Sequence, residues 1–262
     1  MNTGLQGKVA LITGASRGIG KAIALAFASE GVRLALCARN EEQLKLTADE
    51  IQIHTHADVI AVKANMTKIN DIRRFVATAV KKFDHIDILV NNAGGAHVGG
   101  LMTTTDEEWE YHLQLKLLGY IRMARETIPF MKKNSFGKII NIIGTAAKEP
   151  APHFTVSGVT NNGLVSFTKS LSKELEYDHI LVNGIHPGTT DTPLTEETFK
   201  SLAALFQKAP DEIKQNAIAS LPQGRLGSPE DIAKVAVFLA SDAANFVNGS
   251  VIPVDAGKIL GV

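Results

Sequence analysis

Short apolar runs alternate with longer amphipathic segments along most of the chain. Seven of these runs are typical of buried strands, at residues 8–13, 32–38, 58–64, 86–92, 137–143, 179–185 and 249–255. The segments between them have helical spacing, as in residues 20–31 and 71–83. Strands that are apolar throughout, each followed by a helix, predict a parallel sheet with helices on both faces. The expected fold is therefore α/β, with a doubly wound sheet of seven strands.

Composition and charge limit what this fold does. The chain has 262 residues, a length that one α/β domain reaches, so we expect a single domain over residues 1–262. Lys plus Arg and Asp plus Glu are both 27, which argues against a nucleic-acid or membrane-surface partner. No apolar run approaches the ~20 residues that span a bilayer. Cys37, the only cysteine, lies in an apolar run and predicts a core residue of a reduced, cytoplasmic protein.

The first predicted strand leads into a glycine-rich turn. Ligands of doubly wound sheets bind beyond the carboxyl ends of the strands. There the segment "TGASRGIG", residues 13–20, places Gly14, Gly18 and Gly20 at the start of a helix. Glycines let the backbone approach a pyrophosphate closely, and the helix N-terminus offers free N–H groups to it. By itself this spacing also fits an ordinary strand-to-helix turn.

Four later segments follow the glycine turn in a recognisable order. They are "DILVNNAG" (residues 87–94), "VNGIHPGTTDTPL" (182–194), "GRLGSPEDIA" (224–233) and "NGSVIPVDAG" (248–257). Together with the turn they resemble the short-chain dehydrogenase/reductase family, in particular its 3-oxoacyl-reductase-like branch, over nearly the whole chain. The resemblance implies a Rossmann fold and a nicotinamide dinucleotide cofactor. The cofactor residues that it implies are Gly14, Ser16, Arg17, Gly18, Ile19, Gly20, Asn65, Met66, Asn91, Ala93, Gly94, Pro187, Gly188, Thr190 and Thr192.

The end of the second predicted strand bears on which dinucleotide is bound. An enzyme that prefers NAD carries an acidic residue there, which accepts hydrogen bonds from the ribose 2′-hydroxyl. Ala38 holds that place, Arg39 follows it, and Arg17 lies in the glycine turn. Two guanidinium groups suit a 2′-phosphate, so the sequence predicts NADP(H) over NAD(H). The alternative is that one or both arginines are only solvated.

The catalytic residues that the resemblance leads one to expect are missing. Family members use an Asn, a Ser and a Tyr-x-x-x-Lys pair. The residues four positions after the three tyrosines are Leu115, Ala124 and Leu181, so no Tyr-x-x-x-Lys exists in this chain. Counting from "GKIIN" (residues 137–141), "FTKSL" (167–171) and the helix of residues 109–119 gives the occupants of the four places. They are Lys116 for Asn, Gly144 for Ser, Ser157 for Tyr and Asn161 for Lys.

Other groups are candidates to replace the lost proton donor. One positioned acid or base contributes about 10²–10⁴-fold to a rate, so its loss matters. Lys116 is the first candidate, either for the cofactor ribose or for a substrate oxyanion, although a lysine that only reaches toward solvent fits as well. Histidines titrate in the right range, and these loop residues follow strands at the same edge: His97, Lys148, His153 and His186. No residue spacing suggests a metal site.

Two expectations concern the surroundings of the site. Residues 192–222 fall where the family has its substrate lid, and the apolar wall expected there consists of Leu194, Phe199, Leu202, Leu205 and Phe206. Packing of two short helices on the domain explains the same pattern equally well. The resemblance also implies a homo-oligomer, a dimer or tetramer, built through long helices at residues 106–132 and 156–177.

Three hypotheses for function remain open on the sequence. The first is an NADP(H)-dependent oxidoreductase that acts on an unknown apolar carbonyl or alcohol through a non-standard proton relay. The second is a catalytically inactive dinucleotide-binding regulator or partner subunit. The third is non-redox chemistry, an elimination or isomerisation that uses Lys116 or a histidine. Lys116, Ser157 and Asn161, together with Gly144, are the candidate catalytic positions.

Overall fold

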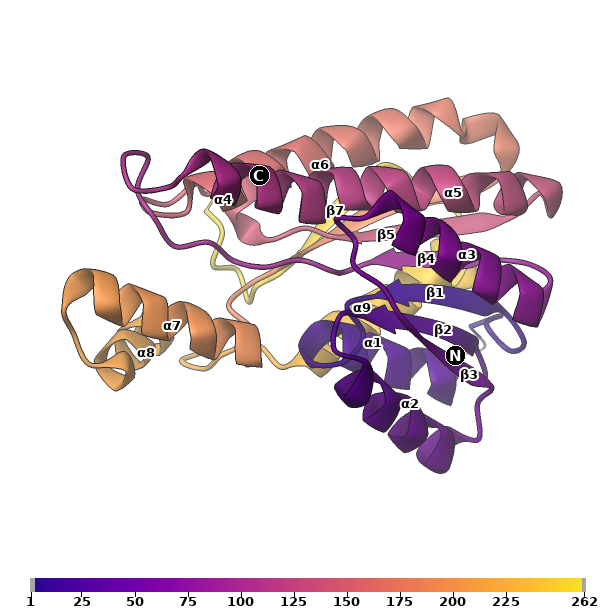
Figure 1. Cartoon of the computed structure of the whole chain (residues 1–262), viewed down its shortest axis with the longest axis horizontal. Helices are drawn as coiled ribbons and strands as arrows, with labels where there is room; N and C mark the ends of the chain where they lie inside the picture. Colours follow the sequence, from indigo (N-terminus) through magenta and orange to yellow (C-terminus); the bar gives the residue numbers. More distant parts are fainter. Residues whose placement is uncertain (1–2, 261–262) are drawn as a thin grey trace.

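The computed structural model describes residues 3–260, which form one sheet of seven parallel strands in the order β3-β2-β1-β4-β5-β6-β7 (Figure 1). This confirms the predicted fold class and strand number. Strand order reverses between β1 and β4. The connections that follow these two strands therefore lead to opposite halves of the sheet, which leaves a crevice at the carboxyl ends of the strands. The strands are β1 (Val9–Thr13), β2 (Arg33–Ala38), β3 (Val59–Lys63), β4 (Ile88–Asn91), β5 (Gly137–Ile142), β6 (Ile180–Pro187) and β7 (Val251–Val254).

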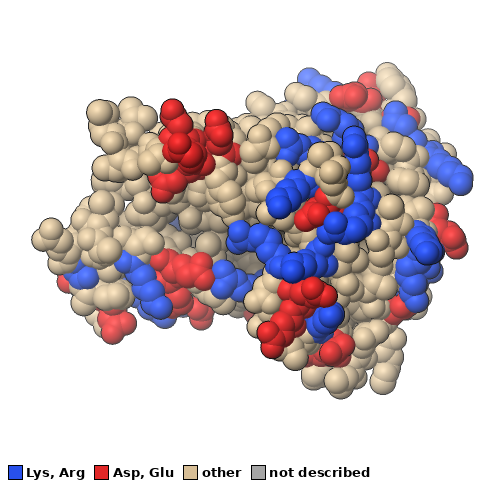
Figure 2. Space-filling model, viewed as in Figure 1, with Lys and Arg blue, Asp and Glu red and all other residues tan. Residues whose placement is uncertain are grey.

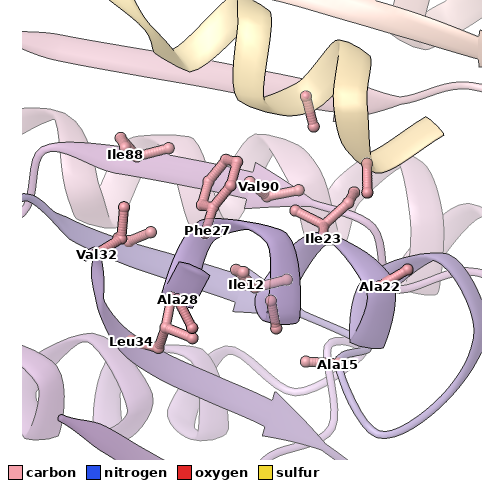
Figure 3. Close-up of a cluster of buried hydrophobic side chains, with 14 of the residues drawn as sticks. Ile12, Ala15, Ala22, Ile23, Phe27, Ala28, Val32, Leu34, Ile88 and Val90 are labelled. Atoms are coloured by element: carbon pink, nitrogen blue, oxygen red, sulfur yellow. The ribbon is translucent and has the colours of Figure 1, made fainter. Parts of the chain in front are cut away.

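Helices cover both faces of the sheet. One layer contains α1 (Gly18–Ser29), α2 (Glu41–Thr55) and α9 (Pro229–Ala240), and the other contains α3 (Ile69–Phe83), α5 (Gly119–Lys133) and α6 (Thr155–Glu174). In the first layer, Phe27 and Ile23 of α1 lie against Ile88 and Val90 of β4 (Figure 3). Both α1 side chains are fully buried, so apolar packing fixes the helix that follows the glycine turn. Short 3₁₀ turns lie at Thr145–Ala147, Glu176–Asp178 and Asp242–Ala244.

The long helix predicted at residues 106–132 is a composite. It starts as α4 (Asp106–His112), continues as a π-helical segment at Leu113–Leu118 and ends as α5. Thr105 caps its start, because its hydroxyl accepts from the Glu108 N–H while the Glu108 carboxylate accepts from the Thr105 N–H. A π-helical turn is costly and is often found at functional sites. This one contains Lys116.

Two helices stand apart from the sheet layers. α7 (Pro193–Phe206) and α8 (Pro210–Ala219) follow β6 and form the orange arm of Figure 1. Phe199 is buried within this arm, whereas Leu205 and Phe206 are exposed. The arm occupies the segment in which a lid is predicted. No helix in residues 3–260 is long and apolar enough to cross a membrane.

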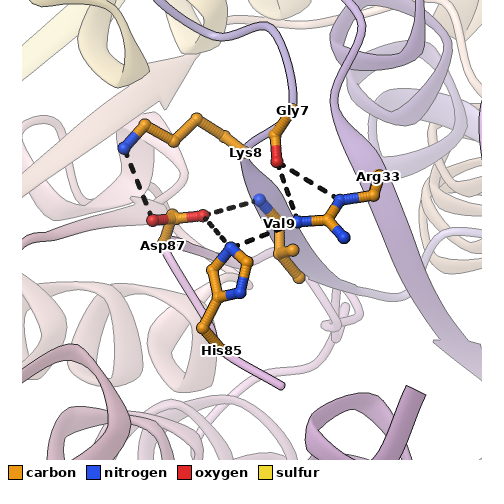
Figure 4. Close-up of polar contacts among 6 residues, drawn as sticks. All are labelled: Gly7, Lys8, Val9, Arg33, His85 and Asp87. Carbon is orange, nitrogen blue, oxygen red and sulfur yellow. Dashed lines mark hydrogen bonds and ion pairs between the residues drawn. The ribbon is translucent and has the colours of Figure 1, made fainter. Parts of the chain in front are cut away.

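A polar cluster ties the strands together at the opposite, amino-terminal edge of the sheet. The buried carboxylate of Asp87 accepts from the Val9 backbone N–H at 2.8 Å and lies 3.5 Å from Lys8 Nζ (Figure 4). His85 Nε2 is 3.2 Å from the same carboxylate. Because this cluster lies at the starts of β1 and β4, it holds the sheet together and is remote from the carboxyl ends.

Candidate active site

A cleft of about 950 Å³ opens at the carboxyl ends of the strands. Residues that follow β1, β2, β3, β4, β5 and β6 all line it, so it spans the point where strand order reverses. Figure 2 shows this face of the molecule hollowed between the α7–α8 arm and the lobe that carries α4. The position is the one that the fold favours for a ligand.

The glycine turn at one side of the cleft is built for close backbone approach. Gly14 has φ +67°, and a Cβ there would lie 2.9 Å from the Cα of Ala93, so no other residue fits without movement. Thr13 Oγ1 accepts from the backbone N–H groups of Asn92 and Ala93, which joins β1 to the loop after β4. No side chain among residues 3–260 caps the start of α1 at Arg17. The first N–H groups of α1 are therefore available to a phosphate.

The two predicted arginines line the cleft and contact elements beyond the glycine turn. Arg39 follows β2 and donates from Nη1 to the Tyr111 hydroxyl of α4 at 2.6 Å. Arg17 forms an ion pair with Glu197 of α7 at 2.8 Å. Both arginines are largely exposed, so a phosphate can reach them. No Asp or Glu of the described residues lines the cleft, and the residues present therefore fit a dinucleotide with a 2′-phosphate.

Most residues that the resemblance assigns to the cofactor are brought together here. Those that line the cleft are Gly14, Ser16, Arg17, Gly18, Ile19, Arg39, Met66, Ala93, Gly94, Pro187, Gly188, Thr190 and Thr192. Three do not line it. Gly20 lies within α1, where a Cβ would be 2.4 Å from Asn92 Nδ2, and Asn65 Oδ1 accepts from Thr67. Asn91 is fully buried and donates to Asn141 Oδ1 at 3.0 Å.

Asn92, rather than its neighbour, is the asparagine that borders the cleft. Its side-chain amide donates to the carbonyl oxygens of Thr13 at 2.9 Å and Gly14 at 3.0 Å. The sequence argument did not select this residue. The sequence did contain a hint. Side chains alternate along a strand, and Asn91 is the last residue of β4, so Asn92 is the first residue after the strand and lies at the edge where ligands bind.

Lys116 is the only predicted catalytic candidate whose long side chain reaches the cleft. It lines the cleft opposite Gly94, where a Cβ would be 3.4 Å from Lys116 Cδ. Within residues 3–260 its ammonium group has no hydrogen bond or ion pair. Burial lowers its pKa from 10.5 to about 8, although part of the side chain borders the cleft. An amine with that pKa gains and loses protons near neutral pH.

Gly144 and Asn161 meet beside the cleft. Gly144 lines it, and a Cβ at that glycine would lie 2.9 Å from Asn161 Nδ2. Asn161 is 3% exposed, and its Oδ1 is enclosed without a hydrogen-bond partner in the described part of the chain. An unsatisfied buried polar group costs about 1–3 kcal/mol. Ser157 is partly buried one turn earlier on α6 and does not line the cleft.

The other candidates lie outside the lining of the cleft. His186 is fully buried, its Nδ1 lies 3.0 Å from the Ile143 carbonyl oxygen, and its Nε2 has no partner among the described residues. Burial lowers the pKa of His186, which favours the neutral ring. His153 packs edge-on against Phe206 of α7 with ring centroids 5.5 Å apart, and His97 Nε2 contacts Thr104 Oγ1. Among residues 3–260 no three His, Cys, Asp or Glu side chains are placed to bind a metal ion.

The sheet topology, the glycine turn and the cationic cleft define a dinucleotide-binding protein of the Rossmann type. A family profile described as Enoyl-(Acyl carrier protein) reductase matches residues 14–258. The 3-oxoacyl-(acyl-carrier-protein) reductase of Thermotoga maritima is 34% identical over 98% of this chain and 99% of its own length. The chain therefore belongs to the short-chain dehydrogenase/reductase family of oxidoreductases, in its 3-oxoacyl-reductase-like branch, as the sequence motifs predict.

Solved structures agree with this assignment. The L-sorbose reductase from Gluconobacter frateurii, complexed with NADPH and L-sorbose, is 33% identical with a TM-score of 0.94 and full coverage of both chains. An actinorhodin polyketide ketoreductase with NADPH is 29% identical with a TM-score of 0.93, over 97% of both chains. The similarity therefore extends over the whole chain and is not limited to the sheet.

Proposed function

We propose that the protein is an NADP(H)-dependent oxidoreductase that interconverts a carbonyl compound and its alcohol, with Lys116 as the group that transfers the proton. The observation that carries the proposal is the Lys116 ammonium at the cleft, which has no partner within residues 3–260 and has a pKa lowered to about 8. Family membership and the similar NADPH-bound reductases support the redox chemistry. None of the three tyrosines, all of which lie within residues 3–260, lines the cleft. Tyr120 donates to the Ile142 carbonyl oxygen, the Tyr111 hydroxyl accepts from Arg39, and Tyr177 is exposed.

Different residues of the cleft would bind different parts of the cofactor. The free N–H groups at the start of α1 would hold the pyrophosphate, and Arg17 and Arg39 would hold the 2′-phosphate. Pro187, Gly188, Thr190 and Thr192 at the end of β6 would surround the nicotinamide. The bound dinucleotide supplies hydride. The protein orients the two reactants, excludes water and moves the proton.

Lys116 accounts for the proton in both directions. In reduction its ammonium gives a proton to the oxygen that gains negative charge, and the neutral amine remains. In oxidation the neutral amine accepts the alcohol proton. Because a general acid or base is most effective when its pKa lies near the working pH, a value of about 8 suits this exchange at neutrality.

We propose an apolar carbonyl or alcohol as the substrate, because three large apolar side chains are among the residues that line the cleft. Leu115, Ile142 and Leu194 line it, and Leu194 is the one member of the predicted apolar wall that does so. We propose that the α7–α8 arm acts as the lid, since Leu194 in the first turn of α7 lines the cleft and Phe206 at the end of α7 packs on His153. The relatives named for 3-oxoacyl and sugar carbonyls motivate the choice of test substrates.

The test is NADPH consumption over a panel of carbonyls that includes acetoacetyl thioesters, aliphatic diketones and ketoses. We expect oxidation of NADPH above the background rate for at least one class. Silence across the panel, with NADPH binding retained, would favour the second candidate, a non-catalytic dinucleotide-binding regulator. The observation that favours this second candidate is that Gly144 and Ser157 stand at two of the family's catalytic positions. Neither residue has a group that titrates near neutral pH. Turnover without any change of NADPH would instead indicate the elimination or isomerisation that remains as a third candidate.

Replacing Arg39 by Gln is expected to raise the Kd for NADPH about tenfold, because a charge-assisted hydrogen bond to the 2′-phosphate is lost at a partly exposed site. The Kd for NADH should stay within about twofold, since NADH has no 2′-phosphate. Calorimetric titration with both dinucleotides measures the difference. Tyr111→Phe is the control, because it keeps the Arg39 charge and removes only the phenol that contacts it. Equal weakening of both dinucleotides would contradict the assignment.

We also propose a cytoplasmic homo-oligomer, as the family resemblance implies. Val159 of α6 and Phe238 of α9 are exposed on helices that cover opposite faces of the sheet, which leaves apolar side chains for a partner copy on each face. Light scattering coupled to size exclusion should give a dimer or tetramer mass. A monomer mass at micromolar concentration would contradict this proposal without affecting the assignment of the cleft.

A further inference from the structure

The loop after β5 lacks a side chain at the point where it meets the cleft. Gly144 has φ −65° and ψ 158°, an extended conformation that any residue adopts, so the backbone does not require glycine there. A Cβ at this position would instead lie 2.9 Å from Asn161 Nδ2, closer than such contacts normally come. The absence of a side chain at residue 144 therefore leaves room for the Asn161 amide, which extends from α6 to the place where the family resemblance puts a serine.

The amide of Asn161 is enclosed but has no hydrogen-bond partner among residues 3–260. The polar neighbours on α6 are occupied, since Thr160 Oγ1 donates to the Val156 carbonyl oxygen and Asn162 Nδ2 donates to that of Gly158. The Asn161 side chain makes no hydrogen bond to any described residue, and it is 97% enclosed. A buried amide without a partner, directed at a residue that lines a cleft, is suited to a ligand in that cleft.

We infer that the Asn161 side-chain amide, which occupies the space beside Gly144, donates a hydrogen bond to the substrate oxygen in the cleft. This inference rests on the proposed reduction of a carbonyl. Hydride adds to the carbonyl carbon, the C=O π electrons move to the oxygen, and the resulting alkoxide takes a proton from the Lys116 ammonium. Asn161 transfers no proton. It holds the oxygen and stabilises the negative charge that develops there.

Relative to the family pattern, the asparagine and the lysine of the active site have exchanged places between two helical elements that face each other. The resemblance puts an asparagine on the first long helix and a lysine on the second, whereas this chain has Lys116 in the π-helical segment and Asn161 on α6. The two elements pack against each other. Both groups remain beside the same cleft, so an ammonium and an amide are still present there, but each now comes from the opposite side.

Gly144→Ala tests the inference without altering Asn161 itself. The added methyl must displace the amide, so we expect kcat/KM for the panel carbonyl that is reduced fastest to fall by about 10²-fold, the typical loss for one oxyanion donor. The Kd for NADPH and the midpoint of thermal unfolding should be unchanged. The matched control is Gly158→Ala on α6, where a Cβ would meet its nearest atom at 3.6 Å, an ordinary contact. This control should keep the wild-type kcat/KM.

A double-mutant comparison separates a donor role from general damage. Asn161→Asp, which keeps the shape and replaces the donor by a carboxylate, should lower kcat/KM at least as much as Gly144→Ala. Adding Gly144→Ala to Asn161→Ala should cost less than about threefold more, because both changes remove one interaction. Full activity of Asn161→Asp, or independent losses in the double variant, would overturn the inference while leaving the reductase assignment intact. A wild-type protein that binds NADPH and reduces no carbonyl would overturn both.

Discussion

Replacing Lys116 by Met is expected to lower kcat for carbonyl reduction by about 10²–10⁴-fold, the usual contribution of one positioned acid or base. Methionine keeps the length and apolar stem of the side chain and removes the proton. Binding of NADPH should change little, because the residues proposed to hold its phosphates, in the glycine turn and at Arg39, are not altered. Single-turnover measurements at saturating NADPH isolate the chemical step.

The pH dependence of the wild-type enzyme should identify the same residue. Burial lowers the pKa of Lys116 to about 8, so the ammonium that reduction needs is present below that pH and is lost above it. The rate of carbonyl reduction should therefore be level at acidic pH and fall as pH rises through about 8. Alcohol oxidation needs the neutral amine, so its rate should rise over the same interval. A bound oxyanion would move both midpoints upward, because it favours the charged amine.

The control for Lys116→Met is Lys133→Met, which removes an exposed lysine at the end of the same helical run. It should leave the rate and both pH profiles unchanged. If Lys116→Met retained the wild-type rate and the inflection near pH 8, another group would carry the proton. His186 would then be the next residue to replace, because its Nε2 has no partner among the described residues.

Replacing Phe27 by Ala is expected to lower the free energy of unfolding by about 3–5 kcal/mol, as is usual for a buried Phe that leaves a cavity. Phe27 is fully enclosed between α1 and the sheet (Figure 3). The loss is large against a total stability of about 5–15 kcal/mol. Urea denaturation followed by far-UV circular dichroism measures it.

Phe246→Ala is the matched control, because Phe246 is fully exposed. Its effect on the free energy of unfolding should stay within about 0.5 kcal/mol. If Phe27→Ala cost less than about 1 kcal/mol, the α1 layer would repack around the missing ring, and the packing described for this layer would not determine stability.

The apolar strands were predictable because burial on both faces leaves a continuous apolar run. All seven observed strands fall at the predicted runs, and their ends differ from the prediction by no more than two residues. The glycine turn was predictable because Gly14 and Gly18 adopt positive φ, which few other residues tolerate. The π-helical segment at Leu113–Leu118, which interrupts the long helix, could not be predicted, because it does not change the apolar periodicity of the sequence visibly.

The sequence by itself therefore determined the sheet, the glycine turn, the arginines in that turn and after β2, and the loss of every Tyr-x-x-x-Lys pair. These features depend on local backbone preference or on the identity of single residues. Only the tertiary structure decided that Asn91 pairs with Asn141 while Asn92 borders the cleft, and that Lys116 extends there without a partner in the described part of the chain. It also decided that Asn161 fills the space beside Gly144. These outcomes depend on contacts between residues far apart in the chain, whose side-chain directions are set only when the layers pack together.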